Sequence, residues 1–376
     1  MKKVIVRRRH LNHPWIFSNE VVSIEDGIKP GDVVRVEERK KTIGSGFFNP
    51  HSLIEVRLYS TIEEDFNENL IRKRLQDAMQ KRKGLGNSFR LVHSESDGLP
   101  GLIIDKYNDY YVVQINSLGM EKKKDLLFRV LIEDYKPRGI YEKNDEHLRK
   151  LEGLDVLNKI AYGQVPELVQ IEQDELKFLV DIINGQKTGF FFDQRANRQK
   201  IAELARGKIL DCFCYTGGFS LYAAKNGEVL GIDISPGAIN LAQQNSHLNG
   251  YQIDFKVGDV FEDLRKFYNE KKKFDTIILD PPSFTKSKNK KSEALRGYKE
   301  INLMAMKLLN NEGILFTSSC SYHISQNEFL QMLVAAANDA KRQFLIIHQG
   351  SATKDHPVLL NFPEGNYLKS LFLKAV

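Results

Sequence analysis

Four aspartates and one cysteine stand at the ends of short apolar runs in the second half of the chain. They are Asp211, Asp233, Asp259, Asp280 and Cys320. In an open sheet of parallel strands, the carboxyl ends of the strands meet at one edge, and ligands bind there. Carboxylates at such an edge accept hydrogen bonds from hydroxyl or amine groups, and a thiolate can bond to an electron-poor carbon. The pattern therefore predicts one site that binds a ligand and also performs a reaction.

The loop after the first of these strands predicts the kind of ligand. Gly217 and Gly218 follow Tyr215 and Thr216, and two glycines let the backbone approach a ligand closely before a helix begins. The loop lacks the GxGxxG pattern of dinucleotide sites, and the sequence contains no GxxxxGK[ST] phosphate loop. A cofactor without a pyrophosphate is therefore favoured over NAD or ATP.

Two of the acids are placed to hold such a cofactor. Asp233 follows the glycine turn at a distance typical of an acid that accepts hydrogen bonds from ribose hydroxyls. Asp259 ends the next strand, and we expect it to receive an adenine amine. Each acid has an alternative role as the N-cap of the helix that follows it.

Asp280 begins the run Asp280-Pro281-Pro282, which ends a buried-looking strand. The two prolines stop the strand and fix the backbone rigidly. A carboxylate and exposed carbonyls would then face a planar base, with Phe284 available to stack on it. The alternative is a turn that carries a surface acid.

Cys320 is the candidate nucleophile. A lone cysteine at a strand end is ordinarily an inert small hydrophobe, but this one lies between two serines beside the strand that ends in Asp280. Carbon 5 of cytosine is a poor nucleophile, and thiolate attack at carbon 6 activates it. Asp280 would hydrogen-bond or protonate the ring during that attack. Methylation of an exocyclic amine needs no cysteine, and we interpret Cys212 and Cys214 as packing residues.

The elements that must position these residues alternate regularly after Gly207. The predicted strands are Lys208–Phe213, Glu228–Ile234, Ile253–Gly258, Phe274–Leu279, Gly313–Ser319 and Phe344–His348. The predicted helices are Gly218–Lys225, Pro236–Leu248, Val260–Phe267, Glu293–Leu309 and Gln326–Ala340. Such alternation is typical of an α/β fold, a parallel sheet with helices on both faces. The last run, Tyr367–Ala375, follows a strand with no intervening helix, so we expect it to return antiparallel.

The first half of the chain has a different pattern. Between Pro30 and Tyr59, short β-rich runs at 33–36, 44–48 and 53–58 alternate with turn residues, which predicts a small barrel or sandwich. A charged helix is expected from Glu63 to about Lys83, and residues 89–172 mix strands and helices. We therefore predict a β-barrel over residues 1–68, a central α+β domain with a helical linker over 69–175, and the α/β domain over 176–376.

Composition limits the class of protein. The chain has 376 residues, enough for two or three domains, and its three cysteines are too few for a disulfide framework. No run approaches a membrane span, no apolar segment of a secretory signal follows the first basic residues, and no Cys/His group has zinc spacing. We expect a cytoplasmic protein without a metal.

The net charge of +6 fits a solvated surface as well as a nucleic-acid partner. The basic clusters are Arg7–Arg9, Arg39–Lys41, Arg72–Arg74 with Lys81–Lys83, and Lys286–Lys291.

The sequence resembles, nearly from end to end, the bacterial 23S ribosomal RNA cytosine-5 methyltransferases that carry an N-terminal PUA domain. The shared segments are His13–Ser18, Thr188–Arg195 with Arg198, Tyr215–Phe219, Asp280–Phe284, Gly297–Lys299, Ser319–Ser321, Asp355–Pro357 and Pro363–Gly365. The resemblance implies a PUA barrel that binds RNA and a Rossmann-like class I methyltransferase sheet of seven strands. It also implies S-adenosylmethionine as cofactor, Phe191, Gln194 and Arg195 over that cofactor, and Cys320 as the group that attacks the base.

Two departures from the family pattern matter. Many RNA cytosine-5 methyltransferases carry a second cysteine just after the Asp-Pro of the fourth strand, where this chain has Pro282. Another group must then take the proton from carbon 5. In addition, Lys286–Lys291 is similar to a segment of related enzymes that methylate guanine, which have an asparagine in place of Cys320. Cys320 therefore favours cytosine.

The sequence thus predicts an RNA cytosine-5 methyltransferase, foremost for 23S ribosomal RNA. The predicted catalytic residues are Cys320 and Asp280. The predicted cofactor-binding residues are Phe191, Gln194, Arg195, Asp211, Tyr215, Thr216, Gly217, Gly218, Asp233, Ile234, Asp259, Val260, Asp280 and Pro281. Two alternatives stay open: an enzyme that methylates guanine or an exocyclic amine on RNA, and a non-catalytic RNA-binding or assembly factor. The expected partner is RNA; a homodimer stays open, and no membrane is expected.

Overall fold

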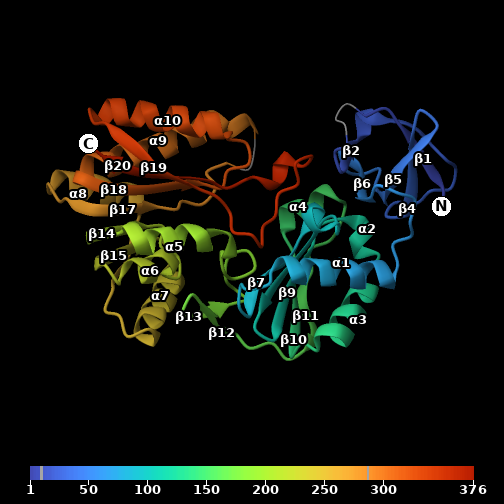
Figure 1. Cartoon of the computed structure of the whole chain (residues 1–376), viewed down its shortest axis with the longest axis horizontal. Coiled ribbons are helices and arrows are strands. Elements are labelled where there is room, and N and C mark those ends of the chain that lie inside the picture. The colour runs from blue at the N-terminus through green and yellow to red at the C-terminus, as the bar shows by residue number, and fades with distance from the viewer. Residues whose placement is uncertain (9–11, 286–287) are drawn as a thin grey trace. The chain divides into compact units, whose positions relative to one another are not determined.

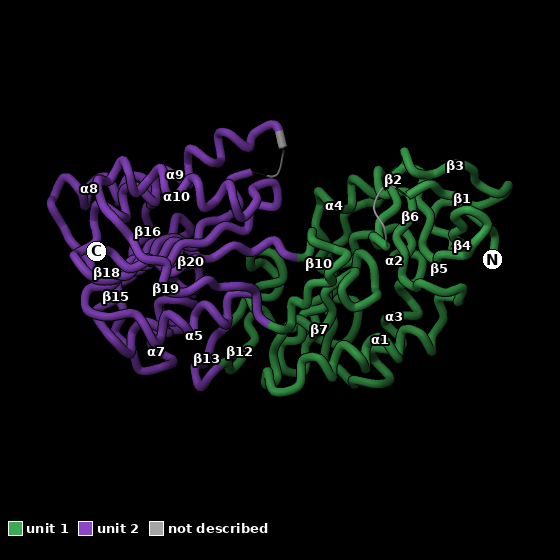
Figure 2. Tube along the Cα trace, turned by 45° about the horizontal axis from the view of Figure 1, so that its top comes forward, with its two compact units in different colours: residues 1–173, 180–192, 354–365 green, residues 174–179, 193–353, 366–376 purple. Residues whose placement is uncertain are grey.

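The computed structural model describes residues 1–8, 12–285 and 288–376, and it divides the chain into two compact units (Figures 1 and 2). Unit 1 contains residues 1–173, 180–192 and 354–365, and unit 2 contains residues 174–179, 193–353 and 366–376. Arg9 and Lys286, which belong to two of the predicted basic clusters, lie outside the described residues. No helix in the described ranges is long and apolar enough to cross a membrane.

Unit 1 begins with a six-stranded sheet in the order β2-β6-β5-β4-β1-β3. Its strands are β1 Lys3–Val6, β2 Trp15–Phe17, β3 Val21–Ile24, β4 Val33–Glu38, β5 Lys41–Phe48 and β6 Ile54–Ser60. Alternate residues of β1 and β4 are buried, as period-two patterning requires, and they form a core with Ile16, Phe48 and Val56. The predicted β-rich character of this region is confirmed, and the structure adds β1, β2 and β3, which the sequence analysis did not predict.

The rest of unit 1 is built on a five-stranded sheet in the order β11-β10-β9-β8-β7. Its elements are α1 Glu68–Lys81, β7 Ser88–His93, β8 Leu102–Tyr107, β9 Tyr110–Ile115, α2 Leu118–Glu121, α3 Lys124–Tyr135, β10 Gly139–Lys143, α4 Glu146–Leu151 and β11 Asn158–Gly163. The prediction that α1 begins at Glu63 is wrong. Asn67 caps the helix, because its side-chain oxygen accepts a hydrogen bond from the backbone N–H of Leu70 at 3.0 Å. The hairpin β12 Leu168–Gln173 and β13 Leu176–Asp181 follows.

Unit 2 contains the predicted seven-stranded sheet, in the order β16-β15-β14-β17-β18-β20-β19. Its strands are β14 Gly207–Cys212, β15 Gly227–Asp233, β16 Asp254–Val257, β17 Phe274–Leu279, β18 Leu309–Ser319, β19 Phe344–Gly350 and β20 Lys369–Ala375. The first five are parallel, whereas β20 runs antiparallel between β18 and β19. Both the α/β fold and the antiparallel return of the last strand are therefore confirmed.

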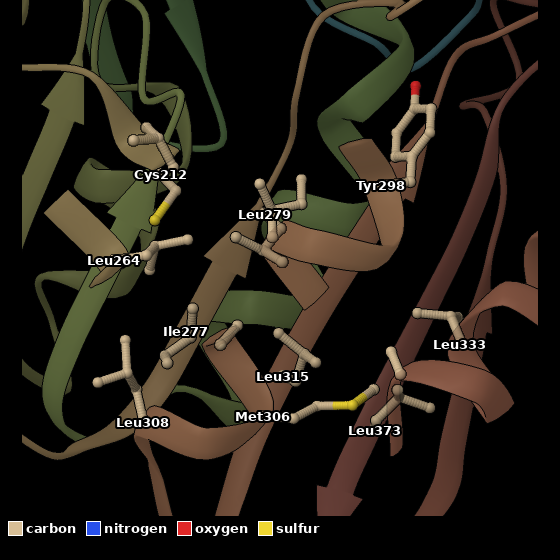
Figure 3. Close-up of a cluster of buried hydrophobic side chains, with 14 of the residues drawn as sticks. Cys212, Leu264, Ile277, Leu279, Tyr298, Met306, Leu308, Leu315, Leu333 and Leu373 are labelled. Atoms are coloured by element: carbon tan, nitrogen blue, oxygen red, sulfur yellow. The ribbon is translucent and has the colours of Figure 1, made fainter. Parts of the chain in front are cut away.

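Helices cover both faces of this sheet (Figure 1). They are α5 Arg195–Leu204, α6 Gly218–Ala223, α7 Pro236–Leu248, α8 Val260–Asn269, α9 Lys291–Leu308 and α10 Gln326–Ala340. Successive residues of β17 point to opposite faces, so Ile277 and Leu279 pack in the cluster with α8, α9 and α10 (Figure 3), whereas Ile278 packs with α5 and α6. The predicted ranges of α7 and α10 agree with the structure because Ser235 and Ser325 cap them.

Candidate active site

The loop after β14 is held in a strained shape by the acid at the end of β15. Phe213, Tyr215 and Gly217 have positive φ values of 63°, 49° and 81°, which is unusual for two residues with side chains. Asp233 stabilises the shape, because one of its carboxylate oxygens accepts a hydrogen bond from the backbone N–H of Tyr215 at 3.0 Å. The other accepts from Ser235 at 2.9 Å. The cap of α7 is therefore Ser235 and not Asp233. Asp233 instead fixes the backbone of the loop after β14, at Tyr215, and the backbone of the turn after β15, at Ser235.

Gly218 faces a buried cation from α5. A Cβ atom at this position would lie 2.9 Å from Nε of Arg198, too close for an ordinary contact. The Arg198 side chain is buried, and desolvation lowers the pKa of its guanidinium, while the charges of Asp280, Asp193 and Asp211 oppose that shift. Gly218 thus makes room for a side chain of the protein itself, which adds a reason for a glycine beyond the approach of a ligand.

Asp211 is fully buried at the end of β14. Its Oδ2 accepts a hydrogen bond from the Ser220 hydroxyl at 2.6 Å, whereas its Oδ1 has no hydrogen-bond partner in the described ranges. Burial, with a smaller contribution from the neighbouring charges of Asp280 and Asp233, raises the pKa of Asp211 to about 7. The strand ends therefore collect three acids whose mutual repulsion favours a protonated Asp211.

This raised pKa predicts a pH-dependent stability. Between about pH 4 and pH 7 the folded chain keeps a proton on Asp211 that the unfolded chain has released, so stability falls as the pH rises through this window. Asp211→Asn stays neutral and keeps an acceptor for Ser220. We expect its free energy of unfolding, measured by urea denaturation, to gain a few kcal/mol on the wild type from pH 4 to pH 7 and then level off.

Asp275 at the start of β17 is the matched control for that prediction. The backbone N–H of Lys208 and the side chain of Asn310 lower the pKa of its carboxyl. Asp275→Asn should therefore show the opposite sign, with a destabilisation that is present above about pH 4 and disappears in acid. A difference between wild type and Asp211→Asn that does not change with pH would contradict the raised pKa of Asp211.

Asp280 follows β17, and its side chain accepts hydrogen bonds from two other segments of the chain. Its Oδ1 accepts hydrogen bonds from Nε2 of Gln194 at 2.7 Å and from the Ser318 hydroxyl on β18 at 2.5 Å. Gln194 is fixed in turn by Nδ2 of Asn197, which donates to its Oε1 at 2.6 Å. The structure thus brings together two of the candidate residues, Asp280 and Gln194. Ser318 was not predicted, although its place two residues before Cys320 was a signal for it.

Cys320 directly follows β18 and is half-buried, whereas both neighbouring serines are fully buried. The Ser321 hydroxyl lies 2.9 Å from Oη of Tyr298 on α9 and 3.0 Å from Oγ of Ser283. These contacts fix the turn that carries Cys320 against the loop that follows Asp280. The turn therefore presents a thiol at the end of the strand next to Asp280.

The other two cysteines are packing residues, as predicted. Cys212 lies in the hydrophobic core (Figure 3), and Cys214 is also buried. Burial raises the pKa of both thiols well above the ordinary value. Phe284, expected to be available for stacking on a base, packs with Tyr298 at 4.5 Å between ring centroids and with Phe261 at 5.8 Å.

The remaining candidate residues differ from one another in their contacts and in how exposed they are. Arg195 on α5 forms an ion pair with Asp174 at 2.6 Å, and Asp174 also accepts a hydrogen bond from Tyr222 at 2.6 Å. Asp259 is the N-cap of α8, which is the alternative role, since its Oδ1 accepts from two backbone N–H groups of that helix at 2.8 and 3.3 Å. The other positions are Thr216, Val260 and Pro281, which are buried, Tyr215, which is half-buried, Ile234, which is exposed, and Phe191, which belongs to unit 1.

The basic clusters differ in how much charge they offer to a partner. Arg72 forms ion pairs with Glu68, Glu133 and Asp134, and the buried Arg82 pairs with Asp97 at 2.6 Å. The cluster around α1 is therefore largely neutralised by the protein's own acids. In contrast, the whole of the cluster Arg39–Lys41 is exposed: Arg39 and Lys40 form the turn after β4, and Lys41 begins β5.

Comparisons with known proteins agree with this geometry. A family described as S-adenosylmethionine-dependent methyltransferase matches residues 154–345, and a PUA-like domain family matches residues 1–61. Ribosomal RNA large subunit methyltransferase I of Aliivibrio fischeri is 40% identical over 386 aligned positions, covering 99% of this chain and 96% of the relative. The protein of that name from Aeromonas hydrophila is 42% identical over 390 positions, covering 100% and 97%. The chain belongs to the S-adenosylmethionine-dependent methyltransferase family.

A solved structure supports the fold of this methyltransferase. A structure described as an S-adenosylmethionine-dependent methyltransferase from Streptococcus mutans superposes with a TM-score of 0.85 over 100% of both chains, at 21% identity. The N-terminal PUA-like domain and the mixed sheet of unit 2 are therefore those of a methyltransferase fold.

The strand ends fit the cofactor of the family. S-adenosylmethionine carries positive charge on its sulfonium and ammonium groups, which suits the cluster of acidic side chains formed by Asp211, Asp233 and Asp280. Each oxygen of Asp233 already accepts one backbone N–H and keeps a lone pair for a ribose hydroxyl. Ile234 is 70% exposed directly after β15 and offers apolar surface for a planar ring. In the described part of the chain, no group of His, Cys, Asp and Glu side chains could hold a metal ion.

Proposed function

We propose that this methyltransferase forms 5-methylcytosine in large-subunit ribosomal RNA, foremost 23S ribosomal RNA, with Cys320 as its covalent nucleophile. The observation that carries the proposal is the position of Cys320. Among the three cysteines it alone is partly exposed, and it directly follows β18, the strand next to β17, which Asp280 follows. An enzyme that methylates an exocyclic amine has no use for a thiol at this place.

Three features support an RNA substrate. Residues 1–61 match a PUA-like domain, and both relatives described above are named for ribosomal RNA of the large subunit. The exposed basic turn Arg39–Lys41 supplies charge that can bind a phosphate backbone. We therefore assign RNA binding to the predicted β-domain of residues 1–68 and the reaction to the domain of residues 176–376.

The proposed reaction uses the two strand-end groups in sequence. The thiolate of Cys320 bonds to carbon 6 of the flipped-out cytosine, and Asp280 hydrogen-bonds or protonates the ring, so that the electrons of the carbon 5–carbon 6 double bond become available at carbon 5. When bound, S-adenosylmethionine supplies a sulfonium methyl group, whose bonding electrons stay with its sulfur when carbon 5 takes the methyl. Removal of the proton from carbon 5 by a base then restores the double bond and expels the thiolate.

The cofactor would be held by the loop after β14 and the ends of the neighbouring strands. We assign Asp233 and Ile234 to the nucleoside part. The loop residues Tyr215–Gly218 and the acids Asp211 and Asp280 are assigned to the charged part, with Gln194 positioning Asp280. Phe191, Arg195, Asp259, Val260 and Pro281 remain candidates on the family resemblance.

The identity of the methylated nucleoside tests the proposal. Purified protein is incubated with methyl-labelled S-adenosylmethionine and 23S ribosomal RNA from cells that lack the gene, and the RNA is digested to nucleosides and analysed by mass spectrometry. We expect the label in 5-methylcytidine. RNA that contains 5-fluorocytidine should form a covalent adduct with the Cys320 peptide, because carbon 5 then has no proton to lose. Label in a methylguanosine or in N4-methylcytidine would overturn the proposal, and the absence of both cofactor binding and any methylated nucleoside would indicate an assembly factor.

A further inference from the structure

Lys369 is a buried lysine beside the turn that carries Cys320. It begins β20, and its register partner on β18 is Ser319, the residue before Cys320. Its Nζ donates hydrogen bonds to the backbone carbonyl of Ser321, the residue after Cys320, at 3.0 Å and to that of Tyr367 at 2.6 Å. With 6% of the residue exposed, the amine is held against the Cys320 turn and largely out of water.

A cation in this position needs a partner. Buried lysines are almost always paired with a carboxylate, because an isolated charge is costly to remove from water. Within the described ranges no carboxylate forms an ion pair with Lys369, and its two recorded partners are neutral carbonyls. Burial lowers the pKa of Lys369 to about 8, and the charge that acts in the opposite direction is that of Cys320. The amine is therefore still mostly protonated at pH 7, with the thiol of Cys320 as the acid that can pair with it.

We propose that Lys369 is a positioning residue for Cys320, whose ammonium group stabilises the thiolate at neutral pH. This inference extends the proposed function, since it explains how the nucleophile is generated. The S–H bond of Cys320 breaks, the proton passes to solvent, and the electron pair stays on sulfur, where the positive charge of Lys369 acts on it. The thiolate is the reactive form of cysteine, and a neighbouring cation lowers the pKa of the thiol.

Other titratable side chains lie in this turn or contact its residues. Tyr298 on α9 contacts Ser321, and burial raises its pKa to about 12, so it stays neutral at pH 7. Asp280, bound to Ser318 of the same strand, brings a carboxylate whose charge opposes a thiolate. Tyr322 and His323 follow in the turn itself, with their ring centroids 5.5 Å apart. The repulsion from Asp280 increases the need for a cation near the sulfur, and Lys369 supplies it.

Lys369 also donates hydrogen bonds to two backbone carbonyls, so the test must separate the effect of its charge from the effect of its hydrogen bonds. Lys369→Gln keeps a side-chain N–H donor without the charge, Lys369→Met removes both, and Lys369→Arg keeps the charge. The rate at which iodoacetamide alkylates Cys320 is measured from pH 5.5 to pH 10 on the full-length protein, by mass spectrometry of the Cys320 peptide. The buried Cys212 and Cys214 serve as internal controls for unfolding.

The wild type should alkylate with a midpoint clearly below the ordinary thiol value of about 8.5, and Lys369→Arg should behave similarly. Lys369→Gln and Lys369→Met should move the midpoint upward by about one pH unit, which slows alkylation at pH 7 by about tenfold. A wild-type midpoint at or above about 8.5 would overturn the inference without any variant, and so would a Gln variant with the wild-type profile. Because no RNA is present, failure of the cytosine-5 proposal would appear only in the nucleoside analysis and not in this measurement.

Discussion

Cys320→Ala should lower the rate of RNA methylation by at least about 10⁴-fold, because without the thiolate nothing activates carbon 5 of the base. The side chain is half-buried and lies outside the hydrophobic clusters, so the change should leave the fold intact. Cofactor affinity, measured by calorimetry, should stay within about twofold of the wild type, since the predicted cofactor contacts come from other residues. The measurement is single-turnover methyl transfer to ribosomal RNA.

The controls for this variant are built into the chain. Cys214→Ala removes a buried thiol from the loop after β14. It should keep methyl transfer near the wild-type rate and lower only the stability that packing provides. Cys320→Ser replaces the thiol with a hydroxyl group, which is far less acidic and forms almost no anion at neutral pH. This variant should therefore be nearly as slow as Cys320→Ala. Full turnover by either Cys320 variant would exclude the covalent route and leave methylation of guanine or an exocyclic amine as the better explanation.

Asp280→Asn should lower methyl transfer by about 10²–10⁴-fold, the range expected for loss of a group that assists proton transfer. Asparagine can keep an oxygen at the Oδ1 position, where Gln194 and Ser318 both donate, so the loops should hold their places. The loss would then report the missing charge and proton rather than a disturbed fold. Single-turnover kinetics with saturating cofactor, together with the cofactor affinity, separate the chemical step from binding.

Ser318→Ala is the matched control for Asp280. It keeps the carboxylate and removes the hydrogen bond from the Ser318 hydroxyl that helps to orient it, so a smaller loss of about tenfold is expected. If Asp280→Asn retained wild-type methylation, Asp280 would be a structural acid at a strand end. If the wild type itself neither bound S-adenosylmethionine nor methylated RNA, the interpretation as an assembly factor would gain support.

Much of the fold could be predicted from sequence because its signals are local. The apolar runs and caps that define α7, α10 and β17 depend on residues within each segment, and their predicted ranges agree with the structure. The N-terminal strands β1, β2 and β3 are short and were missed, since three or four residues carry too little periodicity to be recognised. The start of α1 was misplaced because the charged residues before Asn67 are compatible with a helix until its cap is recognised.

For the site, sequence by itself determined which residues stand at the strand ends, since alternation of strands and helices requires Asp211, Asp233, Asp280 and Cys320 to share one edge. Only the tertiary structure decided what surrounds them. The Ser318 hydrogen bond to Asp280, the fit of Arg198 over Gly218 and the hydrogen bond from Lys369 to Ser321 in the Cys320 turn join residues between 20 and 48 positions apart in the chain. Such contacts depend on sheet order and on the antiparallel return of β20. Burial, which sets the pKa of Asp211 and of Lys369, exists only once those layers have packed.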